Sequence, residues 1–92
     1  MDPEARAEAL QRLRSIEGHV RGIQRLLEGE CSCMELVRQT LAVRRALERV
    51  SRVLVAGHLR GCLVEGMGGA QPEARERAIV DLLDVLDLYG RT

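Results

Sequence analysis

Residues 32–63 read SCMELVRQTLAVRRALERVSRVLVAGHLRGCL, and this stretch determines most of the architecture. Its apolar residues recur at the spacing of one helix face, at positions 34, 37, 41, 50, 53, 54, 59 and 63. Ser32 and Glu35 have the spacing of a capping box, in which each side chain binds the other residue's backbone N–H at a helix start. The stretch therefore predicts one helix of about thirty residues, with Gly57 and Gly61 inside it.

A further helix is predicted on each side. Upstream, an Asp-Pro pair at residues 2–3 has the pattern of a helix start, and apolar residues at helical spacing follow up to Gly29. Downstream, a segment that begins at Pro72 keeps this spacing up to Gly90. Because no stretch has the alternation of a β-strand, we expect an all-α fold of three helices in a single domain, residues 1–92.

The composition is typical of a small helical protein that associates with further copies. The chain has 92 residues, of which 46% are apolar and only 1% aromatic. Aliphatic side chains bury little area each, so a core of this size gains from association. No apolar run approaches the roughly 20 residues of a membrane span, and the acidic N-terminus lacks a signal-peptide pattern. We therefore expect a cytoplasmic protein without membrane contact.

The sequence carries no pattern typical of an enzyme. It has no Ser/His/Asp arrangement, no paired carboxylates in a pocket-forming context, and no phosphate-binding glycine loop after a strand. We therefore expect that the protein is not an enzyme.

Charge is unevenly distributed along the chain. All 14 basic residues are Arg, and 14 acidic residues bring the formal net charge to zero. Residues 12–60 hold 10 Arg against 5 acidic residues, a balance of +5, whereas residues 61–92 hold 3 Arg against 6 acidic residues, a balance of −3. Because the Arg side chain matches phosphate with a rigid fork of donors, the first region indicates a nucleic-acid-binding face. A solvated helix surface is the alternative.

Three Cys and two His carry the candidate metal chemistry. His58 and Cys62 are four residues apart, so on a helix they share a face and can bind one ion. Cys33 stands at the other end of the same predicted helix, in a Cys-x-Cys pair with Cys31. An odd number of Cys is not typical of a disulfide framework. A small buried side chain is the alternative for any one Cys.

The predicted helix keeps these residues apart within one chain. Along a continuous helix, Cys33 and His58 are separated by about 37 Å at 1.5 Å per residue. Two such helices packed antiparallel would bring Cys33 of one chain to His58 and Cys62 of the other, which gives a dimer with two equivalent sites. Two thiolates and an imidazole form a soft ligand set that suits Cu(I). Zn(II) is the alternative if Cys31 or water supplies a fourth ligand.

Three motifs in this order resemble the copper-sensitive operon repressor (CsoR) family. The first is RLRSIEGHVRGIQRLLE at residues 12–28, which resembles the family's first-helix signature. The second is CMELVRQ at residues 33–39, followed by AVRRAL at 42–47, which looks like the start of its second helix. The third is GHLRGCL at residues 57–63, which is similar to its His-x-x-x-Cys segment.

The resemblance implies a transcriptional repressor that forms a homodimer and then a homotetramer from two dimers. Copper members of the family bind Cu(I) through a Cys-His-Cys set, which falls here on Cys33, His58 and Cys62. The metal-free form binds operator DNA through a basic face of its first two helices, and Cu(I) releases it from genes of copper export and homeostasis. The DNA-contact candidates carried over are Arg14, Arg21, Arg44, Arg45 and Arg49.

The chain departs from the family pattern at several positions. His19 stands where the first-helix signature usually has Gln, and Ser32 stands where a Tyr often precedes the ligand Cys. A third-helix Glu usually binds the ligand imidazole from behind. Glu76 is the candidate for this role, and an alternative alignment places Ala78 there. Cys31 is an additional residue that could act as a resolving thiol.

Other functions remain open from the sequence. Nickel and cobalt members of the family add N-terminal nitrogen ligands, but no His precedes His19. Formaldehyde-responsive members have Pro directly after Met, where this chain has Asp2. Persulfide sensors keep two Cys and lack the His, so His58 favours metal, although the three Cys leave thiol sensing as the main alternative. A copper-buffering bundle that does not bind DNA is a further alternative, which the Arg excess disfavours.

Overall fold

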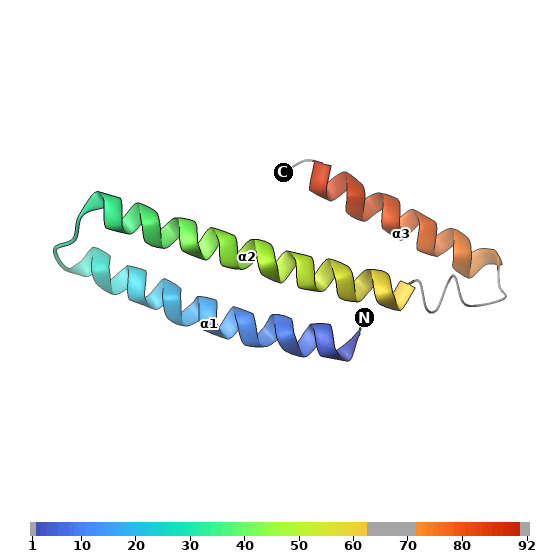
Figure 1. The fold of residues 1–92 in the computed structure, drawn as a ribbon, viewed down its shortest axis with the longest axis horizontal. Helices are drawn as coiled ribbons and strands as arrows, with labels where there is room; N and C mark the ends of the chain where they lie inside the picture. The colour runs from blue at the N-terminus through green and yellow to red at the C-terminus, as the bar shows by residue number, and fades with distance from the viewer. Residues whose placement is uncertain (1, 63–71, 91–92) are drawn as a thin grey trace. The chain divides into compact units, whose positions relative to one another are not determined.

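The computed structural model describes residues 2–62 and 72–90, and all their regular structure is helical. Helix α1 spans Pro3–Glu28, α2 spans Cys33–Cys62, and α3 spans Pro72–Gly90 (Figure 1). The prediction of three helices is confirmed, and α2 continues through Gly57 and Gly61 without a break. The apolar residue predicted to end its pattern, Leu63, lies outside the described residues.

The helix ends follow local signals in the sequence. The Asp2 carboxylate accepts a hydrogen bond from the Glu4 backbone N–H (N···O 3.1 Å), as expected of an N-cap before Pro3. At the start of α2, Ser32 Oγ accepts from the Glu35 backbone N–H at 3.0 Å, which is one half of the predicted capping box. The Glu35 carboxylate, however, does not turn back to Ser32. It accepts instead from Gln39 Nε2 at 2.8 Å, because Gln39 lies one turn ahead on the same face.

The chain divides into two compact units. Residues 7–53 form one unit, a hairpin in which α1 and the first part of α2 run antiparallel and side by side (Figure 1). Ala9, Ile16 and Val50 are the buried apolar residues of this hairpin. The other unit comprises residues 1–6 and 54–92, and its described part buries Ala5 and Ala78.

Many apolar side chains remain exposed in the single chain. Leu27 is 63% exposed, and Met34 is 59% exposed, although both belong to helical apolar patterns. The exposed apolar residues of the hairpin are Leu10, Leu13, Val20, Leu27, Met34, Val37, Leu41 and Leu47. None of the helices in the described ranges has the length and apolar character needed to cross a membrane.

Candidate metal centre and nucleic-acid interface

His58 lies on the last turns of α2, beside an acidic residue of α3. Its Nε2 atom is 3.7 Å from Oδ2 of Asp81, and both side chains are more than a third exposed. In most metal sites with a histidine ligand, a carboxylate next to one imidazole nitrogen orients the ring. It also makes the other nitrogen, which binds the metal, more basic. The pair is therefore suited to holding His58 as a metal ligand.

The carboxylate beside His58 is not the residue favoured by the sequence. Glu76, the candidate for this role, is exposed on α3 and remains a prediction. Ala78, the alternative alignment, is buried. Asp81 follows Ala78 by three residues and so lies on the same helix face. That spacing, counted from the apolar pattern of α3, is the sequence signal that could have identified Asp81.

The two cysteines predicted as metal ligands lie at opposite ends of α2. Cys33 is its first residue and carries an exposed, free thiol. Cys62 is its last residue, and its side chain lies outside the described part of the structure. Within the described residues of one chain, no three His, Cys, Asp or Glu side chains gather as a metal site. The structure thus leaves the set Cys33, His58 and Cys62 as a prediction.

The additional cysteine, Cys31, has a different environment. Its half-buried free thiol donates a hydrogen bond to the Leu26 carbonyl oxygen, with the sulfur 3.0 Å from that oxygen. The carbonyl belongs to the last turn of α1, and it also accepts from the Gly29 backbone N–H at 3.3 Å. Cys31 therefore acts as a side-chain cap for the end of α1.

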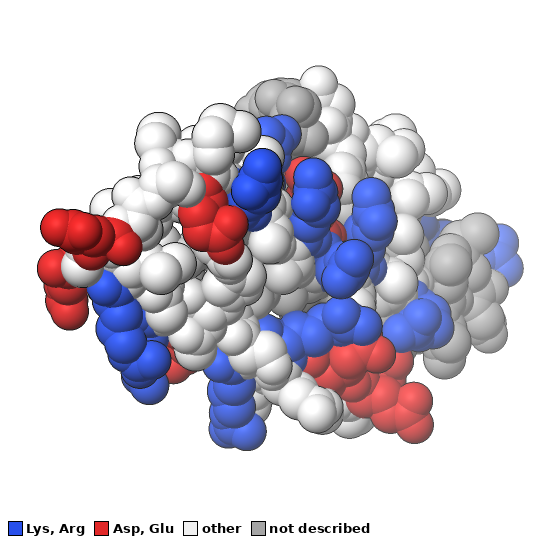
Figure 2. Space-filling model, turned by 60° about the vertical axis from the view of Figure 1, so that its left-hand side comes forward, with Lys and Arg blue, Asp and Glu red and all other residues white. Residues whose placement is uncertain are grey.

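Exposed arginines cover α1 and α2 in the hairpin, and Figure 2 shows arginine side chains gathered next to one another on one face. All five DNA-contact candidates are exposed. Arg21 pairs with Glu17 at 3.7 Å and Arg44 with Glu48 at 3.5 Å, each along its own helix. Such exposed pairs contribute little and exchange readily for another anion. The remaining candidates, Arg14, Arg45 and Arg49, have no ion-pair partner within the described residues.

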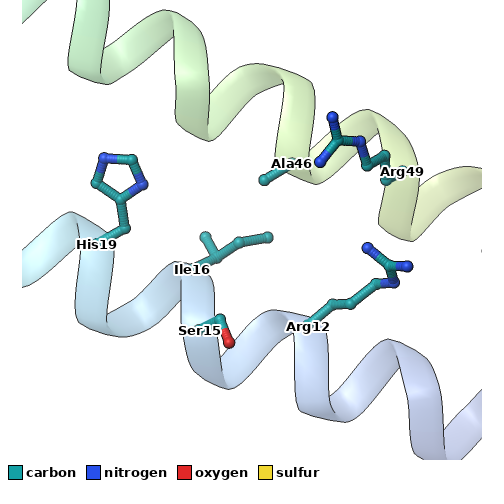
Figure 3. Close-up of a pocket in the computed structure, with 6 residues that line it drawn as sticks. All are labelled: Arg12, Ser15, Ile16, His19, Ala46 and Arg49. Atoms are coloured by element: carbon teal, nitrogen blue, oxygen red, sulfur yellow. The ribbon is translucent and has the colours of Figure 1, made fainter.

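A pocket between α1 and α2 is lined by an arginine of each helix. It measures about 230 Å³ and is lined by Arg12, Ser15, Ile16, His19, Ala46 and Arg49. Figure 3 shows Arg12 reaching from α1 into the space between the helices, whereas the Arg49 side chain lies over α2. Arg12 was not among the sequence candidates, and it also pairs with Glu8 at 3.4 Å in an exposed ion pair. Guanidinium groups at the edge of one open pocket are donors that suit a phosphate group.

His19 links the two helices of the hairpin. Its Nε2 atom lies 2.6 Å from Oε1 of Gln39 on α2, and both side chains are half-buried. His19 was identified from the sequence only as a departure from a family pattern, and Gln39 was not identified. The contact depends on the register of α1 against α2, which local patterns do not specify.

Comparison with known proteins gives a consistent family assignment. Residues 5–87 match the sequence profile of the metal-sensitive transcriptional repressor family. The chain is 36% identical over 78 residues to the copper-sensing transcriptional repressor CsoR of Mycobacterium tuberculosis (strain ATCC 25618 / H37Rv), covering 85% of this chain and 63% of that protein. It is 33% identical over 81 residues to the copper-sensing transcriptional repressor CsoR of Bacillus subtilis (strain 168), covering 88% and 77%. The chain thus spans a little less than two thirds of the mycobacterial relative.

Among solved structures, the chain is similar to the nickel-responsive transcriptional regulator InrS. The TM-score is 0.77 at 30% sequence identity, and the match covers 90% of each chain. The three-helix arrangement is therefore one that a metal-responsive regulator uses.

Proposed function

The chain belongs to the metal-sensitive transcriptional repressor family, whose members are regulators rather than enzymes, and from this we propose that it is a Cu(I)-sensing repressor. In this proposal the metal-free protein binds operator DNA, and Cu(I) binding releases it and derepresses genes of copper export and homeostasis. Residues 1–92 act as one repressor domain in the cytoplasm, the compartment that holds the operator DNA. The copper-sensing relatives of Mycobacterium tuberculosis and Bacillus subtilis support copper as the signal.

The pocket between Arg12 and Arg49 is the observation that carries the DNA-binding part of the proposal. Arg49 has no ion-pair partner within the described residues, and Arg12 has only an exposed one. Placing a DNA phosphate between them would satisfy both guanidinium groups and release counterions from the DNA. Arg14, Arg21, Arg44 and Arg45 are further exposed arginines of α1 and α2, which we propose as additional DNA contacts.

The residues proposed as ligands have the chemistry of a soft-metal site. Thiolates of Cys33 and Cys62 with the imidazole of His58 favour Cu(I) over hard cations. Asp81 beside His58 would hold the ring in position. Zn(II) is the metal expected if a fourth ligand joins the set. The likeness to a nickel-responsive regulator makes Ni(II) the second metal to test.

The continuity of α2 supports a site shared between two protomers. Cys33 and His58 are both on this one helix, and 25 residues correspond to about 37 Å of helix axis. We infer an antiparallel homodimer in which each site takes Cys33 from one protomer and His58 with Cys62 from the other. Exposed apolar residues, and a groove of about 390 Å³ on α1 lined by Leu13, Ile16 and Val20 among others, offer surface for a homodimer and homotetramer.

DNA binding measured against salt concentration tests the pocket. Removing one arginine–phosphate interaction should lower the slope of log K against log salt by about 0.9. Arg12→Ala and Arg49→Ala should each weaken binding of an upstream-region duplex and reduce the slope, whereas Arg77→Ala, an exposed position on α3, should change neither. Unchanged slopes in both pocket variants would remove the pocket from the DNA interface.

The same assay identifies the inducer. Cu(I) should release the duplex at stoichiometric concentration, and Ni(II) and Zn(II) should not. Release by a persulfide donor without release by Cu(I) would assign the protein to thiol sensing. Tight Cu(I) binding without any DNA binding would assign it to copper buffering.

A further inference from the structure

The hydrogen bonds of His19 determine which of its ring nitrogens carries a proton. Gln39 Nε2 donates to Glu35 Oε1 at 2.8 Å, since a carboxylate can only accept. The amide oxygen of Gln39 is therefore the atom that faces His19, 2.6 Å from its Nε2. Because that oxygen is also only an acceptor, Nε2 must be the N–H donor, and a neutral His19 has an unprotonated Nδ1.

The other ring nitrogen, Nδ1, lies on the side of the ring that borders the arginine pocket. His19 lines this pocket, and Figure 3 shows one of its ring nitrogens on the side where Ile16 and Arg49 lie. A neutral ring offers that side a lone pair, which repels the oxygens of an anion. A ring that has gained a proton at Nδ1 offers a charged N–H donor instead.

We propose that the pocket binds a phosphate group together with a proton on Nδ1 of His19. This inference rests on the proposed DNA-binding function of the pocket and adds a pH dependence to it. The proton comes from solvent, one N–H bond forms, and no other bond changes. Histidine is the side chain whose charge ordinarily changes between pH 5 and 8.

The charged groups around His19 explain why the proton and the phosphate bind together. Arg12 on the same helix and Arg49 on α2 line the same pocket as His19, and both carry a positive charge. The carboxylate of Glu35 on α2 binds the amide of Gln39, which lies between it and His19. It also pairs with Arg38 at 3.7 Å. The negative charge of a phosphate bound in this pocket would stabilise the protonated ring. DNA affinity should therefore fall as the pH rises.

The test measures binding of one 30-base-pair duplex, without metal and at constant salt, at pH 6 and pH 8. Each linked proton changes Kd by at most about tenfold per pH unit. Wild type should bind several-fold more weakly at pH 8. His19→Gln should lose most of this difference, and its comparison with wild type removes contributions of every other titrating group. Calorimetric titration with the same duplex in two buffers of different ionisation enthalpy should show proton uptake in wild type and much less in His19→Gln.

A second variant separates this proposal from a merely structural role of His19. Gln39→Leu removes the acceptor at Nε2, so a neutral ring can move its proton to Nδ1 and donate to phosphate without gaining charge. It should bind at pH 8 nearly as well as at pH 6, whereas Gln11→Leu, the same change at an exposed position of α1, should keep the wild-type pH dependence. Circular dichroism verifies that each variant is folded.

The outcomes distinguish the two proposals. If Arg12→Ala and Arg49→Ala weaken DNA binding while His19→Gln and Gln39→Leu keep the wild-type pH dependence and proton uptake, the proton linkage is wrong and the pocket stands. If the arginine variants bind DNA like wild type, the pocket itself is not a phosphate site, and the inference fails with it.

Discussion

Arg60 donates two hydrogen bonds to a single oxygen of Asp2, from Nε at 3.3 Å and from Nη2 at 3.0 Å. Arg60 stands midway between His58 and Cys62 in the sequence, and Asp2 is the N-cap of α1. The interaction therefore ties the residue before α1 to the segment that carries two of the proposed metal ligands. It joins positions 58 residues apart, which the sequence pattern did not indicate.

Replacement of Asp2 should destabilise the protein mainly through the helix cap. Asp2→Ala removes the acceptor for the Glu4 backbone N–H and should lower the free energy of unfolding by about 1 kcal/mol. Asp2→Asn keeps a capping oxygen and loses only the charge opposite Arg60. Because the Arg60 side chain is 60% exposed, this variant should lower the free energy of unfolding much less. Urea unfolding at one fixed protein concentration measures both. Equal losses would show that the ion pair dominates.

Asp81 should affect metal affinity more strongly than Glu76. Asp81→Asn weakens the partner that lies 3.7 Å from His58 Nε2 and should lower Cu(I) affinity by about 10- to 100-fold, the range for residues that orient a ligand. Competition with a Cu(I) chelator measures this. Glu76→Gln is the matched comparison, and it should stay near the wild-type value. The reverse ranking would support Glu76, the residue predicted from the sequence.

The helices were predictable from the sequence because their signals are local. Capping residues, apolar spacing and terminal glycines lie within a few positions of each helix end, and the continuity of α2 follows from its apolar pattern. Two kinds of contact were not predictable. The presence of Arg12 and Arg49 at one pocket depends on the register of α1 against α2, which buried residues such as Ile16 help to set. The approach of Asp81 to His58 depends on how α3 returns to the end of α2.

Local rules also failed where two partners compete for one side chain. The capping box predicted that Glu35 binds back to the Ser32 backbone, but its carboxylate binds Gln39 and pairs with Arg38. Both partners lie three or four residues ahead on the helix, and Arg38 offers a charged donor. A sequence motif can thus identify a residue that makes a local contact without predicting which partner its side chain binds.

DNA and Cu(I) should oppose each other's binding by the same factor. A ligand shifts a conformational equilibrium only if it binds one state more tightly, so Cu(I) must favour the state that binds DNA poorly. Linkage then requires that saturating DNA lowers Cu(I) affinity as much as Cu(I) lowers DNA affinity. Chelator competition with and without an upstream-region duplex measures the first factor, and anisotropy with and without Cu(I) measures the second. Equal Cu(I) affinities in both conditions would show that copper is not the inducer.

A mixed dimer of two inactive variants should recover half of the metal sites. The continuous α2 places Cys33 and His58 about 37 Å apart along its axis, so we expect each site to draw on two protomers. In homodimers of Cys33→Ala or of Cys62→Ala, every site lacks one thiolate and should bind Cu(I) weakly. When the two variants are unfolded and refolded together, one site of the mixed dimer takes Cys33 from the second variant and His58 with Cys62 from the first, and it is complete.

The other site of that mixed dimer lacks both thiolates. One tight Cu(I) per mixed dimer is therefore expected, compared with two in the wild-type dimer, measured by chelator competition after the mixed species is isolated through a tag on one variant. Wild-type protein taken through the same refolding provides the control for recovery of the sites. If isolated mixed dimers bind Cu(I) no better than either homodimer, all ligands of a site come from one protomer, and α2 must bend or break when the metal binds.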